Sequence, residues 1–258
     1  MLLPFFSCEK EKTKKPETHV PVTTDMQNGF PDNPFVNGYI YASCNTFYYS
    51  QGASSRSQVF NACFSDPARN LTAGFDHISD SQIFSSTETS GNVSVGDVSV
   101  SGISLGDINS GNTFRYFTTS NVSNFNYSTL IYTQGNGSFA GLNLTIPRGF
   151  PTITVPTTTL TLSKSSGGSI DVSSFISNYD SLVVRFTQGS SSASAFKKRV
   201  SKQNPVLTFT PADLSFLSQS QYQQIYFQAF NYSNRIVSDK SYVFELCNKT
   251  SFYMTINP

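Results

Sequence analysis

Apolar and polar residues alternate along much of this chain with a period of two. Between Asn92 and Asp107, Val, Ile and Leu residues are separated by Ser and Gly, and Thr159–Leu162 reads Thr-Leu-Thr-Leu. Alternation over such short runs predicts half-buried β-strands, because successive side chains of a strand point to opposite faces. Clusters of Gly, Asn and Ser between the runs predict turns. Long stretches of Ala, Leu, Glu and Lys at helical spacing are absent, so the pattern predicts an all-β protein.

The segment after Pro147–Pro151, which we interpret as a linker, contains the most regular series of strand-like runs. About eight strands in about 105 residues, with turns at this spacing, predict an immunoglobulin-like β-sandwich. One helical turn is predicted at Thr210–Leu217, with Thr210 as its N-cap and Pro211 at its first helical position. The predicted strands are 152–155, 159–162, 168–172, 181–186, 206–209, 224–230, 241–246 and 252–256.

The N-terminal half of the chain reads as another set of short strands broken by turns. Two aromatic-rich runs, Tyr39–Tyr49 and Gln58–Phe64, flank the turn-like run Ser50–Ser57 and predict a β-hairpin. Centring the hairpin on this turn places Cys44 opposite Cys63, where a cross-strand disulfide is geometrically feasible. Two buried thiols are the alternative. Further strands are predicted within Thr113–Phe117, Tyr127–Thr133 and Gly137–Ile146.

An apolar run, a small residue and a cysteine open the chain, as Leu2–Ser7 followed by Cys8. The run is too short for a transmembrane helix, which needs about 20 apolar residues, and shorter than the apolar region of most signal peptides. We interpret residues 1–7 as the remnant of a signal peptide whose start lies upstream; a chance Ser-Cys pair is the alternative. Residues 8–32 mix Lys with Glu and lack an apolar period, which predicts a disordered tether with an r.m.s. span of about 27 Å.

The segment Leu3–Glu11 resembles the start of lipoproteins from Bacteroidetes, in which Ser-Cys is commonly followed by an acidic or Lys-rich stretch. The resemblance implies a diacylglycerol on the Cys8 sulfur and an acyl group on its freed amine, which together anchor a protein stably in a bilayer. It also implies an outer-membrane location, at the cell surface or on the periplasmic face. The C-terminal stretch is similar to the immunoglobulin-like modules that end many surface lipoproteins of this group.

These interpretations divide the chain into four segments. We predict two β-sandwich-like domains in tandem behind a lipid anchor, the C-terminal one immunoglobulin-like. The segments are 1–7, a signal-peptide remnant; 8–32, the tether; 33–148, an N-terminal β domain; and 149–258, the C-terminal domain.

Charge and composition narrow the function classes. The formal net charge is +1, so the chain lacks the strong positive field of nucleic-acid-binding proteins. Only 13% of residues are charged, while 23 Phe and 13 Tyr accompany many Ser, Thr and Asn residues, a composition that fits an extracellular all-β protein. The membrane, through the lipid, and a glycan or protein ligand are the partners that we expect; nucleic acid is not.

Residue types that carry catalysis are scarce. His77, between Asp76 and Asp80, forms the one local cluster of catalytic residue types; we interpret it as a capped turn, with a metal-binding or proton-sharing role as the alternative. A pair of opposed carboxyl groups, as in glycoside hydrolases, has no local support, since Glu88 and Glu245 are far apart in the sequence. Nucleophile elbows, phosphate loops and dinucleotide fingerprints are absent. We therefore predict that the protein is not an enzyme and needs neither a cofactor nor a metal.

Exposed aromatic rings remain the candidate ligand-binding groups, because their faces offer apolar area on which sugar rings stack. Packing in the core or on the sheet surface is the alternative for each of them. The basic run Lys197–Arg199 is predicted at a hairpin tip. We predict a non-catalytic binding or adhesion module; a polysaccharide-processing enzyme or accessory subunit, or a purely structural surface spacer, are the alternatives. The candidate aromatic residues are Tyr48, Tyr49, Tyr116, Phe117, Tyr222 and Tyr226.

Overall fold

A computed structural model of the chain confirms the prediction of a mostly β protein. Cys8, the tether 8–32, Tyr49 and the Asp76–Asp80 cluster lie outside the described residues, so their predicted roles stay predictions. The structure describes residues 35–48, 54–70, 93–100, 102–110, 113–117, 130–133, 139, 141–146, 148–187, 194–218 and 220–258.

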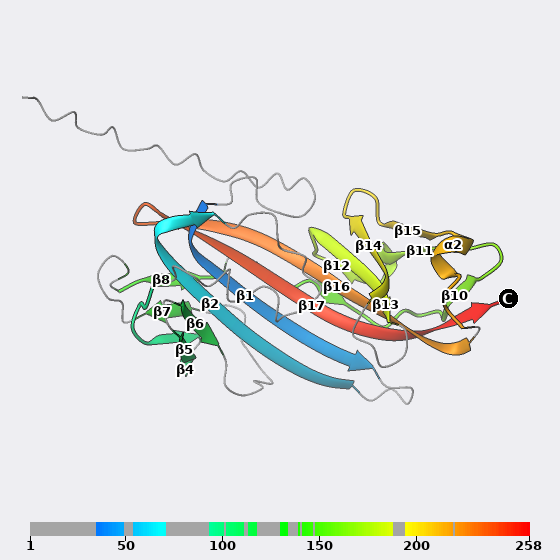
Figure 1. Ribbon diagram of the computed structural model, residues 1–258, viewed down its shortest axis with the longest axis horizontal. Coiled ribbons are helices and arrows are strands. Elements are labelled where there is room, and N and C mark those ends of the chain that lie inside the picture. The colour runs from blue at the N-terminus through cyan, green and yellow to red at the C-terminus, as the bar shows by residue number, and fades with distance from the viewer. Residues whose placement is uncertain are drawn as a thin grey trace, which may run out of the picture.

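A hairpin of two 18-residue strands, β16 (Ser220–Val237) and β17 (Lys240–Asn257), runs the length of the molecule (Figure 1). Its turn residues Ser238 and Asp239 have φ angles of 50° and 61°. This left-handed backbone is that of a type I′ turn, which matches the twist of the flanking strands. The sequence predicts two separate strands where β17 is continuous, because the polar residues between its apolar runs keep pairing with β16.

Other strands extend this hairpin into a sheet that, within the described residues, has nine strands. β17 pairs in parallel with β1 (Phe35–Tyr48) over residues 242–251 and with β10 (Leu160–Ser163) near its end. Segments from before and after the predicted linker therefore share one sheet. Apart from β10, the order is β14 (Ser194–Ser201), β13 (Ser181–Thr187), β16, β17, β1, β2 (Ser54–Asn70), β6 (Thr113–Phe117) and β5 (Gly106–Ser110).

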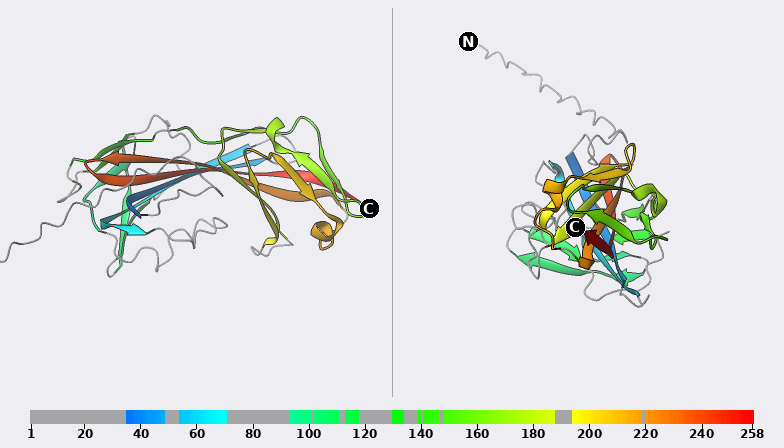
Figure 2. Two further views of the ribbon diagram at one scale, coloured as in Figure 1. Left: turned by 90° about the horizontal axis from the view of Figure 1, so that it is seen from above. Right: turned by 90° about the vertical axis from the view of Figure 1, so that its right-hand side faces the viewer.

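Two hydrophobic cores lie against one face of this sheet, and Figure 2 shows smaller strands gathered at each end of the long hairpin. β17 contributes to both cores, with Phe244 and Leu246 in one and Met254 and Ile256 in the other. The predicted boundary at residue 148 falls between the two sets of covering strands. These are β3 (Val98–Val100), β4 (Ile103–Ser104), β7 (Leu130–Thr133) and β8 (Asn143–Thr145), then β9 (Thr152–Ile153), β11 (Gly168–Asp171), β12 (Ile176–Ser177) and β15 (Val206–Phe209).

The β1–β2 hairpin forms, but its predicted register is wrong. Cys44 lies opposite Gln58, and Cys63 lies opposite Tyr39. The observed register puts the even-numbered apolar residues of both strands, such as Ile40 and Phe60, on the face that meets a core. If the register were shifted by an odd number of residues, the apolar residues of one strand would point to the opposite face of the sheet. The need to bury the apolar residues of both strands in the same core therefore determines the register.

The predicted helical turn is confirmed as α2 (Pro211–Leu214). The Thr210 hydroxyl accepts a hydrogen bond from the Asp213 amide, and the Asp213 carboxylate accepts one from the Thr210 amide. This capping box satisfies two amides that a helix start otherwise leaves without partners. The basic run at 197–199, predicted at a hairpin tip, lies instead within β14, where it pairs with β13.

Candidate functional site

The sheet face opposite the two cores, here called the second face, carries a band of polar and aromatic side chains. On β17 these are the odd-numbered residues, from Glu245 to Tyr253, which alternate with core residues. Glu245 and Cys247 are fully buried beside a third hydrophobic cluster that includes Tyr39 and Val243, Ser251 is 1% exposed, and Tyr253 is 42% exposed. The second face is therefore buried where β17 pairs with the middle of β1, which we call its closed end. It is exposed to solvent near the C-terminal end of β17, which we call its open end.

At the closed end, the Tyr39 hydroxyl donates a hydrogen bond to the Glu245 carboxylate. Burial, and next the charge of Glu245, raise the pKa of Tyr39 well above its usual value. Burial likewise raises the pKa values of Tyr41 and of the Cys247 thiol. These groups stay protonated at neutral pH, and Glu245 lies too deep to meet a solute.

Lys249 and Gln228 lie side by side between the closed and open ends, as partners in the β16–β17 ladder. Burial lowers the pKa of Lys249 to about 7, because a low-dielectric environment disfavours the charged amine. The Lys249 amine lies 6.0 Å from the centre of the Tyr41 ring. Gln228 is 1% exposed, and neither its Oε1 nor its Nε2 has a hydrogen-bond partner.

The open end holds a group of side chains that we call the basic–aromatic patch: Lys197, Arg185, Tyr226, Gln224, Ser251 and Tyr253. They come from four neighbouring strands, β14, β13, β16 and β17. Lys197, Arg185, Tyr226 and Ser251 are paired from strand to strand, and the pair Gln224 and Tyr253 lies two residues further along β16 and β17. All six side chains therefore point to the same face of the sheet.

Polar contacts order the centre of the basic–aromatic patch. The Arg185 guanidinium lies 5.3 Å from the centre of the Tyr226 ring. The Tyr226 hydroxyl donates to Gln224 Oε1 at 2.6 Å, and Gln224 Nε2 donates to the Ser251 hydroxyl at 2.8 Å. These contacts hold the tyrosine ring and the amide in place.

Two cations stand directly opposite each other in the patch, since Arg185 is the ladder partner of Lys197. Both basic side chains therefore leave the sheet on the same face. Burial lowers the pKa of the Arg185 guanidinium, and the neighbouring Tyr226 raises it again. A guanidinium remains charged despite such shifts, so Arg185 keeps its positive charge.

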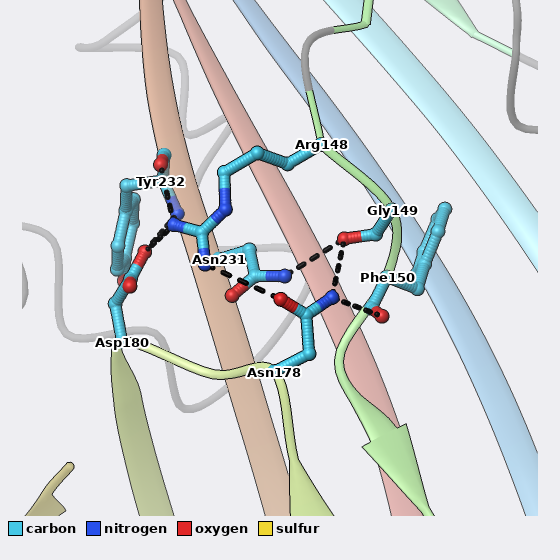
Figure 3. Close-up of polar contacts among 7 residues, drawn as sticks. All are labelled: Arg148, Gly149, Phe150, Asn178, Asp180, Asn231 and Tyr232. Carbon is cyan, nitrogen blue, oxygen red and sulfur yellow. Dashed lines mark hydrogen bonds and ion pairs between the residues drawn. The ribbon is translucent and has the colours of Figure 1, made fainter.

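A second polar cluster fastens the predicted linker to the sheet (Figure 3). The Arg148 guanidinium donates to the Asp180 carboxylate at 2.5 Å and to the Tyr232 carbonyl at 3.3 Å. The same Asp180 oxygen accepts the Tyr232 amide at 2.9 Å. One carboxylate therefore ties the linker to both β16 and the start of β13.

Asparagine side chains complete this attachment. Asn231 donates to the Gly149 carbonyl at 2.7 Å, and Asn248 donates to the Pro151 carbonyl at 2.9 Å. Because these hydrogen bonds hold the linker against two strands of the sheet, we interpret the cluster as structural. The segment 148–151 is thus a fixed strap along β16 and β17.

The predicted aromatic residues fall into three classes. Tyr226 lies in the basic–aromatic patch and is half-buried. Tyr116 is wrong as a ligand-binding residue, because it is 2% exposed and its hydroxyl accepts the Val95 amide at 2.8 Å inside a core. The backbones of Tyr48, Phe117 and Tyr222 lie in β1, β6 and β16, while their side chains, with all of Tyr49, lie outside the described residues.

The predicted Cys44–Cys63 disulfide is absent, and the alternative of two buried thiols holds. The register places Cys44 on the same face as Ile40 and Cys63 on the face of Tyr39. Side chains on opposite faces of a sheet point apart, which prevents a disulfide.

Sequence reasoning missed Arg185, Gln224 and Tyr253, which complete the patch. Arg185 interrupts the apolar run Ser181–Phe186. A single cation within a predicted apolar strand was the one feature of the sequence that could have indicated a site at this position. No local motif joins these residues, because they meet only when β13, β16 and β17 pair.

Within the described ranges, no group of three or more His, Cys, Asp and Glu side chains is arranged to hold a metal ion. The helices in that same part of the chain include none with the length and apolar character needed to cross a bilayer. The chain matches no protein-family model, no curated protein and no solved structure.

Proposed function

We propose that this protein is an envelope-anchored lipoprotein that acts as a non-catalytic binding or adhesion module, with the basic–aromatic patch as its ligand surface. The observation that carries the proposal is the gathering of two cations, two tyrosines and an amide on the open part of one sheet face. Aromatic and Arg side chains are the groups that dominate recognition surfaces.

The position of the patch supports presentation away from a membrane. The pairing of β1 with β17 begins at Gly38, level with Tyr242, whereas the patch lies around Tyr253 of β17. At about 3.3 Å per residue, these levels are roughly 36 Å apart along the sheet. In our proposal the anchor lies on the N-terminal side of β1, so the patch lies on the part of the long hairpin that is remote from the membrane.

The C-terminal part, in our proposal, is an immunoglobulin-like sandwich whose final strands carry the patch. The order β14–β13–β16–β17 corresponds to strands C′, C, F and G of a variable-type domain. The pairs β9–β12 and β11–β15 correspond to the facing sheet. This strand order supports the immunoglobulin-like type. In our proposal the ligand surface lies on the C′CFG sheet of this unit, and the strap and β17 connect it to a second, N-terminal β unit.

The lipid anchor can be tested by growing the native host with labelled palmitate. We expect the label on the wild-type protein and its loss in Cys8→Ala. A Cys8→Ala protein that still carries label, or an unlabelled wild-type protein in the soluble fraction, would refute the anchor.

Binding can be tested on a glycan array with the full chain carrying Cys8→Ala, so that no lipid contributes. We expect selective binding that Tyr253→Ala reduces, because Tyr253 is exposed and its truncation leaves the core intact. The matched control is Val155→Ala, which removes an exposed side chain (54%) that is not part of the patch. Silence across the array, together with no binding to envelope proteins of the host, would favour a structural spacer.

A further inference from the structure

We propose that this protein bears tensile load and that the parallel pairing of β1 with β17, which we call the β1–β17 clamp, resists the pull. This inference rests on the proposed function for the source of the load, because a protein anchored before β1 that holds a ligand at the patch is pulled from both sides. Three features of the sheet carry it: the direction of the two strands, the continuity of β17 and the burial of their contact.

The two strands of the clamp run side by side in the same direction (Figure 1), with ladder partners from Gly38 and Tyr242 to Phe47 and Ser251. A pull on the start of β1 and an opposite pull on the end of β17 therefore slide the strands past each other. The hydrogen bonds of a parallel ladder are evenly spaced and lie across the strands, so this sliding loads the whole paired stretch at once. A pull on the two strand starts would instead break the bonds one after another.

Neighbouring strands hold both members of the clamp from their outer sides. β1 lies between β17 and β2, and β17 lies between β1 and β16. β2 pairs with β1 from Phe35 to Tyr48, and β16 pairs with β17 from Lys240 to Ile256. Neither strand can slide without breaking a ladder on each of its sides, so the neighbours add to the resistance of the clamp.

β17 leads the load past the C-terminal core. The strand is continuous from Lys240 to Asn257 and contributes side chains to both cores. The patch begins on β17 at Ser251, which is the last ladder partner of β1. A force applied at the patch therefore passes along the covalent backbone of β17 directly into the clamp, and it does not have to pass through the strap at 148–151.

Burial shields the clamp from water on both faces of the sheet. One set of its side chains lies in a core, the other lies in the third hydrophobic cluster of the second face, and all are at most 5% exposed. A buried ladder bond cannot be exchanged for a bond to water until the strands separate, so breaking it costs more than at an exposed strand. The two sets are Ile40, Ala42, Phe244 and Leu246, then Tyr39, Tyr41, Val243 and Cys247.

Single-molecule force spectroscopy of the full chain, carrying Cys8→Ala, tests the clamp by changing only the direction of pull. In the first geometry the handles are fused before Met1 and after Pro258, so that β1 slides along β17. In the second geometry a peptide tag inserted between Ser238 and Asp239 replaces the C-terminal handle, so that the strands peel apart from their starts. We expect the first unfolding event to need about twofold or more force in the first geometry, because the ladder bonds yield together rather than in succession.

The length released in the first event identifies the strands that yield. In the first geometry, detachment of β1 frees the chain between Phe35 and the strap, roughly 110 residues, which extends by roughly 350–400 Å. Ile40→Ala, in the clamp, should raise the rate of this event at constant force by about tenfold or more, because it removes buried methylene groups from the contact. Its matched control is Ile170→Ala on β11, the same truncation in the C-terminal core, which should leave the rate unchanged.

Equal forces in the two geometries overturn the inference, because a clamp must depend on the direction of pull. A first event of clearly different length, or equal effects of Ile40→Ala and Ile170→Ala, overturns it as well. Thermal melts close to that of wild type verify folding. If the insertion unfolds the protein, Asp239→Cys provides the attachment point, since the native thiols of the described residues are buried; if Ile40→Ala unfolds, Ile40→Val and Ile170→Val take the places of the two alanine variants.

These measurements use neither lipid nor ligand, so they separate the clamp from the proposed function. Equal forces in the two geometries, together with palmitate labelling and selective binding on the array, overturn the clamp and leave an anchored binding module. Silence on the array, together with a force that depends on the direction of pull, leaves the clamp and removes the ligand.

Discussion

Replacing Lys249 with methionine should stabilise the protein at neutral pH and remove part of its pH dependence. Methionine keeps most of the length of the side chain and removes the charge. In the folded protein burial lowers the pKa of Lys249 from 10.5 to about 7. Between these two values the unfolded chain binds more protons than the folded one, so the free energy of unfolding rises with pH. Lys249 therefore destabilises the fold most below pH 7, where the amine must stay charged inside the sheet face.

The size of the effect follows from the shift. One pKa unit corresponds to about 1.4 kcal/mol, so the charged amine costs up to about 5 kcal/mol of stability well below pH 7. At pH 9 the difference in the free energy of unfolding between wild type and Lys249→Met falls to about 2 kcal/mol. The change between pH 6 and pH 9, about 2–3 kcal/mol, is the quantity to measure.

Urea unfolding at pH 6, 7, 8 and 9, monitored by tyrosine fluorescence, gives this difference. Subtracting the variant from wild type cancels the other groups, including Cys247, whose raised pKa makes stability fall as pH rises through the pKa of the unfolded thiol. Lys202→Met, at an exposed position, is the control and should show no pH-dependent difference. A constant difference between wild type and Lys249→Met from pH 6 to pH 9 would show that Lys249 keeps an ordinary pKa and would refute the reasoning.

Three further predictions concern local polar contacts. Tyr39→Phe should lower the free energy of unfolding by about 1–3 kcal/mol, because it removes the donor to the buried Glu245 carboxylate; urea unfolding at pH 7 measures this, and an unchanged midpoint contradicts it. Thr210→Ala should cost about 1 kcal/mol through loss of the capping box, whereas Thr210→Ser should restore most of it. Asp180→Ala should lower the free energy of unfolding by about 1–2 kcal/mol, since Arg148 and the Tyr232 amide of β16 lose the acceptor that they share. Arg148→Ala should lower it by less, because the Tyr232 amide keeps its acceptor. A larger loss in Arg148→Ala than in Asp180→Ala would contradict this account.

Local features were predictable because they depend on residues close in sequence. The cap at Thr210 follows from the Thr-Pro-x-Asp spacing, and the structure forms it as expected. The short strands around Leu160 and Val206 follow from alternation. The type I′ turn at Ser238 and Asp239 was not predicted, because neither residue is the Gly or Asn that usually marks such a turn.

The register of β1 and β2 shows why pairing was harder to predict. Turn chemistry alone placed Cys44 opposite Cys63, but the face that must be buried decided otherwise. Tyr116 was misjudged for the same reason: nothing near it in the sequence reveals that a core closes around its ring and that Val95 supplies its hydrogen bond. Tyr226, by contrast, was predicted as a ligand-binding candidate and lies in the patch, although its neighbours there were not anticipated.

The sequence by itself determined the all-β class, the helix cap and the run of alternating strands, since each depends on the periodicity of side chains along a few residues. Only the tertiary structure decided that β17 spans both cores, that β1 pairs with it in parallel, and that Arg185, Lys197, Tyr226 and Tyr253 share one face. These facts depend on the register between strands far apart in the chain. That register is fixed by which faces can be buried together, a property of the assembled sheet that no single strand contains.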